Sequence, residues 1–264
     1  MSEPVRSNAM RLYPTKDDVL ADLERRILER EFTVGAQLPS ERLLATQYGV
    51  SRPVIREVLR GLAERGYVEI HPGRGSFVRP VGTDTLAEPL SRVARRTGVT
   101  PRHLVSARTM LECAAAELSA EIATEADVEV LQQALEAHAA AADLQARARS
   151  DVAFHEAVAA VSGNPVIAMM FGAIRPLVYG LMLRSLSDRE VTRAGEPFHD
   201  RIVAAIAAHD PVAARAAMAE HLRLALDFYG EDLDIPLADA LTRRGIDPAH
   251  LSDALRLTRP LQTG

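Results

Sequence analysis

The sequence predicts a mainly α-helical protein in two parts: a small helical domain with a short β-hairpin, followed by an all-α bundle. Two observations lead to this prediction. Between residues 38 and 78, a helix, a tight turn, a second helix and two short strands follow one another. From residue 91 to residue 229, apolar side chains recur at helical spacing and no strand signal interrupts them.

The N-terminal residues 1–15 carry no periodic pattern, and we expect them to be flexible. Residues 16–30 predict a helix, because five apolar side chains fall on one of its faces: Val19, Leu20, Leu23, Ile27 and Leu28.

Residues 38–66 predict two helices joined by a tight turn. Ser40 is a natural N-cap of the first helix, and Gly49 tolerates the left-handed conformation that ends it. We expect Ser51 to cap the second helix, on which Arg52 and Arg56 lie about one turn apart. Strands near residues 67–70 and 77–78, joined by a Pro-Gly-Arg-Gly turn, complete the unit. A short helix with arginines near its N-terminus, set against a preceding helix, is suited to the major groove of DNA.

These residues closely resemble the winged helix-turn-helix of GntR-type transcription regulators. The motifs that carry the resemblance are LPSER at 38–42, GVSR at 49–52, and GSFV at 75–78. The resemblance implies a DNA-binding domain over residues 16–80, whose second helix enters the major groove and whose wing approaches the minor groove. Under it, Arg52 and Arg56 read bases, while Arg42 and the wing contact the backbone. The full set of DNA-contacting residues carried over is Arg42, Ser51, Arg52, Val54, Arg56, Gly73 and Arg74.

Charge is unevenly distributed along the chain. The net charge is −5 over 264 residues, yet residues 51–79 hold six arginines against three glutamates. The local field over this helix and hairpin, rather than the global charge, decides whether phosphates are attracted.

Cys113 is the single cysteine, so an intramolecular disulfide is excluded. No signal-peptide pattern and no apolar run near 18 residues is evident, so we expect a cytoplasmic protein without membrane contact.

The remainder of the chain predicts a linker, a bundle and a tail. Residues 81–90 are expected to be the linker, and residues 91–229 the bundle. Its helices are predicted over 101–123, 125–146, 148–162, 165–185, 195–208 and 211–229. Residues 230–264 form a tail of open role, with short helices near 235–242 and 248–257. We expect a surface appendage; a helix clasping a partner subunit is the alternative.

Four side chains with metal-ligand chemistry face the inside of the predicted bundle. Asp151 and His155 are four residues apart and share a helix face. His199 and His221 each lie on the apolar stripe of their own helix. A buried carboxylate is costly unless it is paired or bound to a metal. Imidazoles with a carboxylate suit zinc, nickel, manganese or iron, whereas separate core hydrogen bonds are the alternative for each histidine.

The bundle resembles the all-helical FCD domain of the FadR-like branch of GntR regulators. The resemblance lies in Arg108-x-x-x-Glu112, Asp151-x-x-x-His155, Asn164-Pro165, Arg175, His199-x-x-Ile202 and Met218-x-x-His221. Metal-binding members use one aspartate and three histidines, and those positions fall on Asp151, His155, His199 and His221. The resemblance implies a divalent transition metal, with zinc expected first. The other five histidines are not assigned to the metal: His71, His103, His138, His209 and His250.

Three further residues are candidates for binding an effector. Arg108 and Arg175 match pocket positions of the family, and a guanidinium forks onto a carboxylate. Surface salt bridges are the alternative for both, for example Arg108 with Glu112. Asn164 could donate to an effector or hold the Gly-Asn-Pro turn.

Together these resemblances imply a ligand-responsive transcription regulator and not an enzyme. It would bind a palindromic operator as a homodimer, and a small carboxylate at the metal site would modulate it. A metal-dependent hydrolase is one alternative, but Ala159 stands where an HExxH enzyme needs its second histidine. A regulator that senses the metal alone, without an organic effector, is the other alternative.

Overall fold

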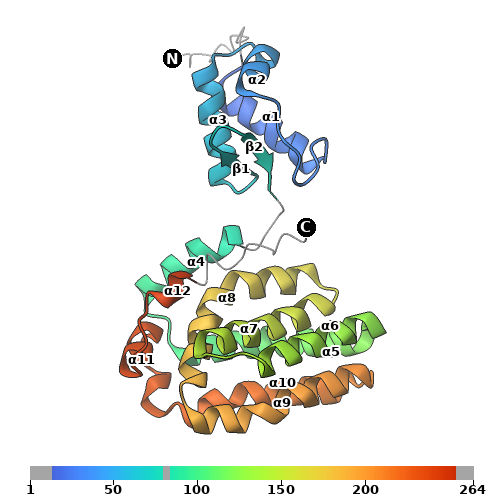
Figure 1. Ribbon diagram of the computed structural model, residues 1–264, viewed down its shortest axis with the longest axis vertical. Helices are drawn as coiled ribbons and strands as arrows, with labels where there is room; N and C mark the ends of the chain where they lie inside the picture. Colours follow the sequence, from blue (N-terminus) through green and yellow to red (C-terminus); the bar gives the residue numbers. More distant parts are fainter. Residues whose placement is uncertain (1–13, 80–83, 254–264) are drawn as a thin grey trace, which may run out of the picture. The chain divides into compact units, whose positions relative to one another are not determined.

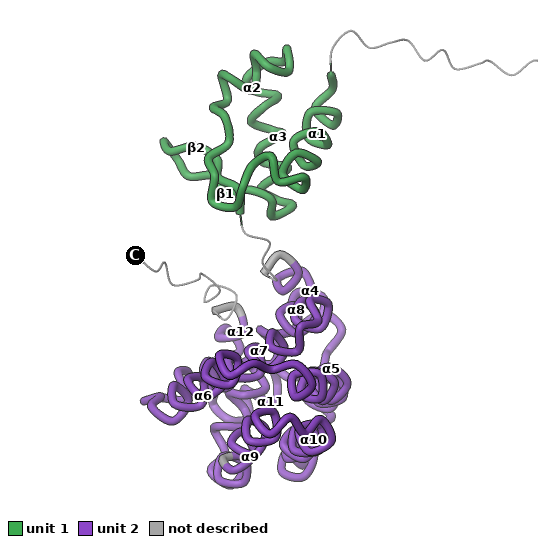
Figure 2. Tube along the Cα trace, turned by 90° about the vertical axis from the view of Figure 1, so that its right-hand side faces the viewer, with its two compact units in different colours: residues 1–82 green, residues 83–264 purple. Residues whose placement is uncertain are grey.

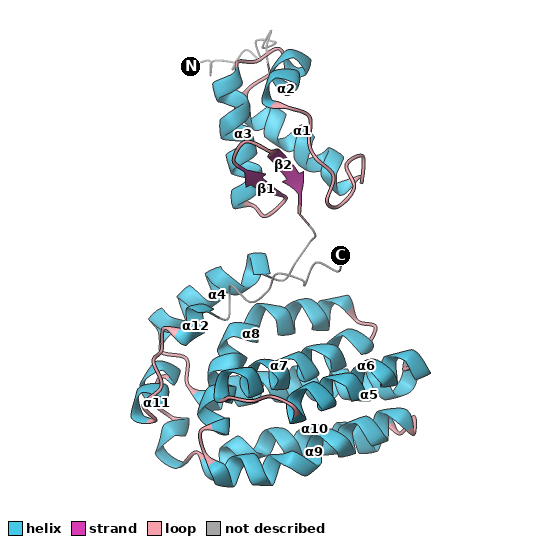
Figure 3. Cartoon of the chain, in the orientation of Figure 1, coloured by secondary structure: helices cyan, strands magenta, loops and turns pink. Residues whose placement is uncertain are grey.

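The computed structural model describes residues 14–79 and 84–253. The chain divides into two compact units, residues 1–82 and residues 83–264 (Figure 2). The first unit combines helices with a two-stranded sheet, and the described part of the second unit is helical (Figure 3). The predicted fold class is therefore confirmed.

Unit 1 is a three-helix domain with a β-hairpin wing (Figure 1). Its elements are α1 (Lys16–Leu28), α2 (Glu41–Tyr48), α3 (Arg52–Glu64), β1 (Val68–His71) and β2 (Gly75–Val78). The strands are antiparallel, with Val68 opposite Val78. One face of each helix contributes to a common core that includes Leu23, Leu44 and Ile55.

The helix ends of unit 1 follow the sequence signals with one exception. The Ser40 side chain accepts a hydrogen bond from the Leu43 amide, and Gly49 ends α2 with a φ of 65°. Ser51 stands at the N-cap position of α3, but its side chain makes no capping hydrogen bond. Pro53 at the second helical position has no N–H to donate, which removes one of the two usual capping partners.

Unit 2 is built from long helices with a short C-terminal extension (Figure 1). The long helices are α4 (Asp84–Thr97), α5 (Pro101–Ile122), α6 (Glu125–Ala139), α7 (Leu144–Val161), α8 (Pro165–Leu186), α9 (Arg189–Ala207) and α10 (Pro211–Phe228). The extension holds η1 (Gly230–Leu233), α11 (Leu237–Arg243) and α12 (His250–Asp253). Helices α6 and α7 are separated by residues 140–143 rather than by residue 147, and Asp143 caps α7. Helix α9 begins at Arg189 rather than at residue 195.

Helix α4 occupies most of the segment predicted as a linker. Ala87 and Ala94 are buried, and α4 packs against α8, so an apolar face holds it in the bundle. Pro89 lies inside this helix and removes one of its backbone hydrogen bonds, and the burial of the apolar face against α8 offsets that loss. The prediction of a linker over 81–90 is therefore wrong from Asp84 onward, and residues 80–83 lie outside the described residues.

Helix α8 is a central helix of unit 2 and contacts α4, α5, α7, α11 and α12. An 18-residue stretch of α8 has a mean hydropathy of 1.8, so among the described residues this helix alone has the length and composition to cross a membrane. The expectation that the chain has no such apolar run was wrong. However, 61% of that stretch is buried inside the unit, which is the pattern of a core helix in a folded bundle.

The C-terminal extension belongs to the core of unit 2. Leu233, Leu237, Leu241 and Leu251 are buried in the same cluster as residues of α8. The backbone amide of Leu237 donates to the carbonyl of Val99 at 2.9 Å. The prediction of a surface appendage is wrong for the described residues 230–253, because these leucines pack against α8. The sequence did not show this, because the short helices of the extension have little apolar periodicity of their own.

Candidate metal centre and nucleic-acid interface

The exposed face of α3 and the wing form one arginine-rich groove in unit 1. Side chains from α2, α3 and the β1–β2 turn line it together, and the arginines among them are Arg42, Arg52, Arg56, Arg60 and Arg74. Among the predicted DNA-contacting residues, Ser51 is exposed, Gly73 lies in the turn with a φ of 74°, and Val54 is partly buried against the domain core. Val54 thus has a packing role in addition to the predicted contact.

An acidic side chain holds the two arginines at the start of α3. The Glu41 carboxylate lies 2.9 Å from Nε of Arg56 and 3.6 Å from a terminal nitrogen of Arg52. Both guanidinium groups remain more than half exposed. They are free to exchange this surface partner for another acceptor, since an exposed ion pair contributes only about 0–1 kcal/mol.

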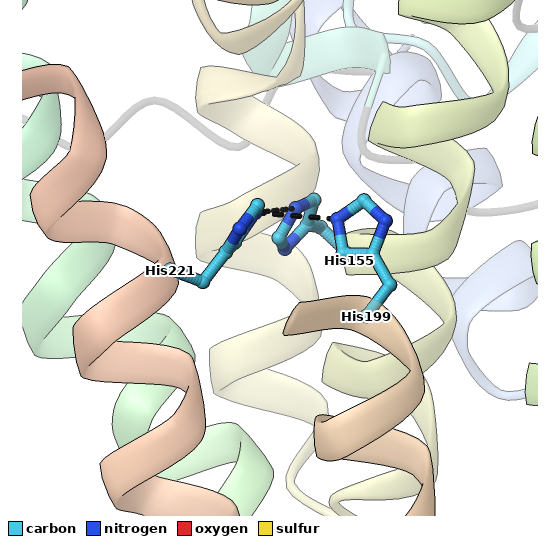
Figure 4. Close-up of side chains that lie close together, drawn as sticks. All are labelled: His155, His199 and His221. Carbon is cyan, nitrogen blue, oxygen red and sulfur yellow. Dashed lines mark hydrogen bonds between the residues drawn. The ribbon is translucent and has the colours of Figure 1, made fainter. Parts of the chain in front are cut away.

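Three histidines from three helices of unit 2 meet at one point (Figure 4). His155 comes from α7, His199 from α9 and His221 from α10. The Nε2 atom of His221 lies 3.2 Å from the Nε2 atoms of both His155 and His199. Asp151, one turn before His155, approaches to 3.5 Å from Nε2 of His155 and 3.6 Å from Nε2 of His199.

The spacing of these nitrogens fits a single bound cation. Two imidazole nitrogens about 2.0–2.1 Å from zinc are about 2.9 Å apart at a right angle and about 3.4 Å apart at the tetrahedral angle. The observed 3.2 Å lies between these values. Mutual hydrogen bonds explain the cluster less well. One imidazole nitrogen offers either a hydrogen or a lone pair, so Nε2 of His221 cannot donate to one neighbour and accept from the other.

Asp151 is buried in a way that fits a metal ligand. Only 4% of the residue is exposed, and its Oδ1 atom makes no hydrogen bond within the described part of the chain. A buried carboxylate oxygen without a donor is costly, and a cation among the three imidazoles would satisfy it. Asp151, His155, His199 and His221 therefore fit a divalent ion with one oxygen and three nitrogen donors.

Glu112 contacts the Nδ1 side of the His155 ring, and Arg108 pairs with Glu112. Nδ1 of His155 lies 2.6 Å from a carboxylate oxygen of Glu112, although the angle departs from that of a well-formed hydrogen bond. Arg108 donates to both oxygens of the same carboxylate, at 2.6 and 3.2 Å. Burial by itself would raise the pKa of Glu112, but Arg108 and His155 more than offset it and hold this pKa at about 2. The ionised Glu112 fixes the His155 ring so that Nε2 faces the centre.

Two of the histidines, His199 and His221, are held in the neutral form that binds metal. Burial is the main cause that lowers the pKa of His199 to about 4, with Asp151 opposing it. Burial also lowers the pKa of His221 well below its ordinary value. Both imidazoles are therefore neutral at physiological pH and need lose no proton to bind a cation.

A small cavity of about 60 Å³ opens beside this cluster. Arg108, Asp151, His199 and His221 line it, together with apolar residues of α8, α9 and α10 such as Met182, Val191 and Leu224. Of the three predicted effector-binding residues, only Arg108 lies at this cavity.

The other two predicted effector-binding residues make structural contacts: Arg175 forms an ion pair and Asn164 caps a helix. The guanidinium of Arg175 lies 3.3 Å from the Glu156 carboxylate on α7. The side chain of Asn164 caps α8 by accepting from the amides of Val166 and Ile167. The structure brings neither residue to the cavity, because Asn164 stands at the far end of α8 from Met182 and Arg175 is drawn towards α7.

Sequence reasoning missed one residue of the site. His138, on α6, lines the cavity, and its ring lies edge-on to that of His199 with 5.5 Å between centroids. A possible signal was its helical spacing from Leu131, which is buried, and from Ala134 and Leu135, which are partly buried.

Comparisons with known proteins agree with the two units. Residues 15–78 match the family of bacterial regulatory proteins named gntR, and residues 103–224 match the FCD domain. The HTH-type transcriptional repressor NanR of Enterobacter sp. is 34% identical over 213 residues, which are 78% of this chain and 82% of that protein. NanR of Escherichia coli K12 is 33% identical and matches 83% of this chain and 85% of its own length.

A solved structure shows the same fold. The GntR protein of Streptococcus agalactiae has a TM-score of 0.62 and 29% sequence identity, covering 79% of this chain and 97% of its own. These relatives are transcription regulators, and the hydrolase alternative is set aside with them. The chain therefore belongs to the gntR family of bacterial transcription regulators, with an FCD domain behind its DNA-binding domain.

Proposed function

We propose that the protein is a transcription regulator whose operator binding is controlled by a small carboxylate at a metal centre. The observation that carries this proposal is the convergence of three imidazole nitrogens and the Asp151 carboxylate beside a cavity that Arg108 also lines. Asp151, His155, His199 and His221 would hold the ion, and zinc is the first candidate, ahead of nickel, manganese or iron.

The charges around the cavity favour an anionic effector. Arg108 and Glu112 neutralise one another, and Asp151 offsets only one charge of a divalent ion. One positive charge would remain uncompensated in a mostly buried site. A buried charge is stabilised by a partner of opposite sign, so a single carboxylate would complete the balance. When bound, the ion supplies a Lewis-acidic position for that carboxylate, and Arg108 supplies a directed guanidinium.

On the DNA side, we propose recognition by α3 and the wing of a homodimer. Arg52 and Arg56 would read bases, while Arg42, Ser51, Gly73 and Arg74 would contact the backbone, and Val54 would support the helix against the core. A two-fold symmetric dimer binds an inverted repeat. Since the relatives are named repressors, repression is the expected direction of control. A cytoplasmic location follows from a DNA target.

One experiment tests the core of this proposal. The native protein is examined by mass spectrometry for a bound metal and a co-purified acid, and operator affinity is then measured with and without each acid. We expect one metal per chain and a 5- to 150-fold change in operator affinity when the effector binds, the range of a coupling of about 1–3 kcal/mol.

Metal sensing without an organic effector remains the second candidate. The neutral imidazoles of His199 and His221 favour it as much as they favour an effector site, because neutral imidazoles can hold a metal without an organic ligand. If chelation releases the operator while no carboxylate changes its affinity, this second function replaces the first.

A further inference from the structure

Glu41 is the one acidic residue among the described residues that line the arginine-rich groove of unit 1. It is the first residue of α2, where the helix N-terminus stabilises a negative charge. Its Oε2 atom accepts from Nε of Arg56 at 2.9 Å and lies 3.6 Å from a terminal nitrogen of Arg52. The Glu41 side chain is 32% exposed, whereas those of Arg52 and Arg56 are 58% and 53% exposed. The carboxylate is therefore less accessible to DNA than the two guanidinium groups that it holds.

The contact with Glu41 leaves Arg56 able to read a base. A guanidinium has five N–H donors, and Glu41 uses only the Nε–H of Arg56. The two terminal nitrogens of Arg56 have no acceptor in the described part of the chain, so they remain as a fork for the two acceptors on a guanine edge. Because Nε is held from α2, the side chain has less conformational freedom left to lose when DNA binds.

The negative charge of Glu41 opposes contacts with the DNA backbone. A phosphate is an anion, so the carboxylate repels it when it approaches Arg52 or Arg56. The acceptors on a base edge carry only partial charges, so this repulsion is much smaller there. Phosphate contacts carry no sequence information, whereas base contacts do. A carboxylate at this position therefore weakens binding to random DNA more than binding to the correct sequence.

We propose that Glu41 is a specificity-determining residue that orients Arg56 towards a base and disfavours phosphate contacts by Arg52 and Arg56. This inference rests on the proposed recognition of DNA by α3 and the wing. Glu41 acts through the two arginines, and it is a positioning residue that itself reads no base.

The first variant, Glu41→Gln, removes the charge and keeps the length of the side chain. Fluorescence anisotropy measures the binding of the full-length protein to two duplexes of equal length. One is the duplex that the wild type selects from a randomised library, and the other is a scrambled duplex. At about 0.1 M salt, Glu41→Gln should bind the scrambled duplex about 8-fold more tightly than the wild type does, with a salt slope steeper by about 0.9, the effect of neutralising one more phosphate.

The second variant, Glu41→Asp, keeps the charge but is one methylene shorter and loses its reach to Nε of Arg56. Its affinity for the scrambled duplex should stay that of the wild type. Its affinity for the selected duplex should fall about 5-fold, the effect of one net hydrogen bond. In an Arg56→Ala background the same change should cause no further fall, because the partner of the carboxylate is gone.

Glu29→Gln is the matched control, because it removes an exposed carboxylate that pairs with Arg25 on α1 and does not line the groove. It changes the net charge of the chain by the same amount as Glu41→Gln and should change neither affinity.

Four outcomes overturn the inference. An unchanged affinity and salt slope of Glu41→Gln on the scrambled duplex would exclude the opposition to phosphates. An unchanged affinity of Glu41→Asp for the selected duplex would exclude the orienting effect. A further fall when Glu41→Asp is combined with Arg56→Ala would make Glu41 itself a base-reading residue. In these three cases the proposed DNA recognition stands. If the wild type selects no sequence from the library, that recognition fails and the inference fails with it.

Discussion

His221 lies between His155 and His199, and each of the three comes from a different helix. Each of these helices contributes one imidazole to the cluster. We therefore expect His221→Ala and His199→Ala each to lose the bound metal. At a metal concentration 100 times the dissociation constant, the wild type should gain about 2.7 kcal/mol of stability that neither variant gains.

Mass spectrometry gives the metal content, and thermal unfolding with and without chelator gives the stability difference. His103→Ala is the control for metal content, because the His103 side chain accepts from the Thr100 backbone amide at the start of α5 and belongs to neither histidine cluster of the described residues. A variant that still holds one ion per chain would take its histidine out of the coordination set.

The buried histidines also predict how the metal-free protein responds to acid. The pKa of His199 is about 4 in the folded chain and near 6.5 in the unfolded chain. Between these values the unfolded state binds more protons, so stability is complete above about pH 6.5 and declines as the pH falls towards 4. The loss attributable to His199 is on the order of 3 kcal/mol.

Urea unfolding of the chelated protein at pH 7 and pH 4.5 measures this decline. His199→Asn removes the titrating ring and should make the decline shallower. A decline as steep in His199→Asn as in the wild type would mean that other groups cause it.

Arg56 and Arg42 differ in their expected contacts with DNA. Arg56→Ala should cost about 1–3 kcal/mol on the operator and relax the preference at one base pair, as expected for a bidentate contact to guanine. Arg42→Ala should weaken specific and random DNA alike and reduce the salt slope by about one. Fluorescence anisotropy over a salt series distinguishes the two. Equal losses on operator and random DNA for Arg56→Ala would contradict base reading.

At the residue scale, the four residues predicted as metal ligands lie together in the structure, whereas only one of the three predicted effector-binding residues lines the cavity. The four-residue spacing of Asp151 and His155 identified them as candidates, and the position of His199 and His221 on apolar stripes identified the other two. His138 stands on a mostly exposed helix, and only the packing of α6 against α7 and α9 brings it to the site. Arg175 matches a pocket position of the family, but its guanidinium lies beside the Glu156 carboxylate on α7. No pattern in the local sequence indicates this ion pair.

At the element scale, the C-terminal extension should stabilise unit 2 as strongly as a core helix does. Leu241 is completely buried against α8, so Leu241→Ala should cost about 2–5 kcal/mol. Val212, at the exposed start of α10, is a matched control whose change to Ala should stay within about 0.5 kcal/mol. Urea unfolding followed by circular dichroism measures both. A small effect for Leu241→Ala would return residues 230–253 to the status of an appendage.

Long, strongly periodic elements were predictable, and short or proline-containing ones were not. The bounds of α5, α8 and α10 agree with prediction to within about one residue, because caps at Thr100, Asn164 and Asp210 mark their starts. Helix α4 was missed because Pro89 indicates a turn when read locally. Its helical state depends on burial against α8, which lies far away in the sequence.

At the scale of the whole molecule, we expect two chains to act together on DNA. Sedimentation velocity should give a dimer at micromolar concentration, and footprinting should give a protected inverted repeat, because operator symmetry mirrors protein symmetry. An operator with one half-site changed should bind more weakly than the intact one. A monomer that protects an asymmetric site would contradict the proposed mode of recognition.

The interior of unit 2 also contains a positive charge that governs how the unit opens. The guanidinium of Arg184 on α8 is fully buried, lies 3.8 Å from the centre of the Tyr229 ring, and donates to Asp232 in η1. If η1 and α11 detached by themselves, this buried cation would lose Asp232 and keep only the more distant carboxylate of Asp188, 3.8 Å away, at a cost of up to about 3–5 kcal/mol. Fraying from the C-terminal side is therefore suppressed, and residues 230–243 open only when the bundle opens as a whole.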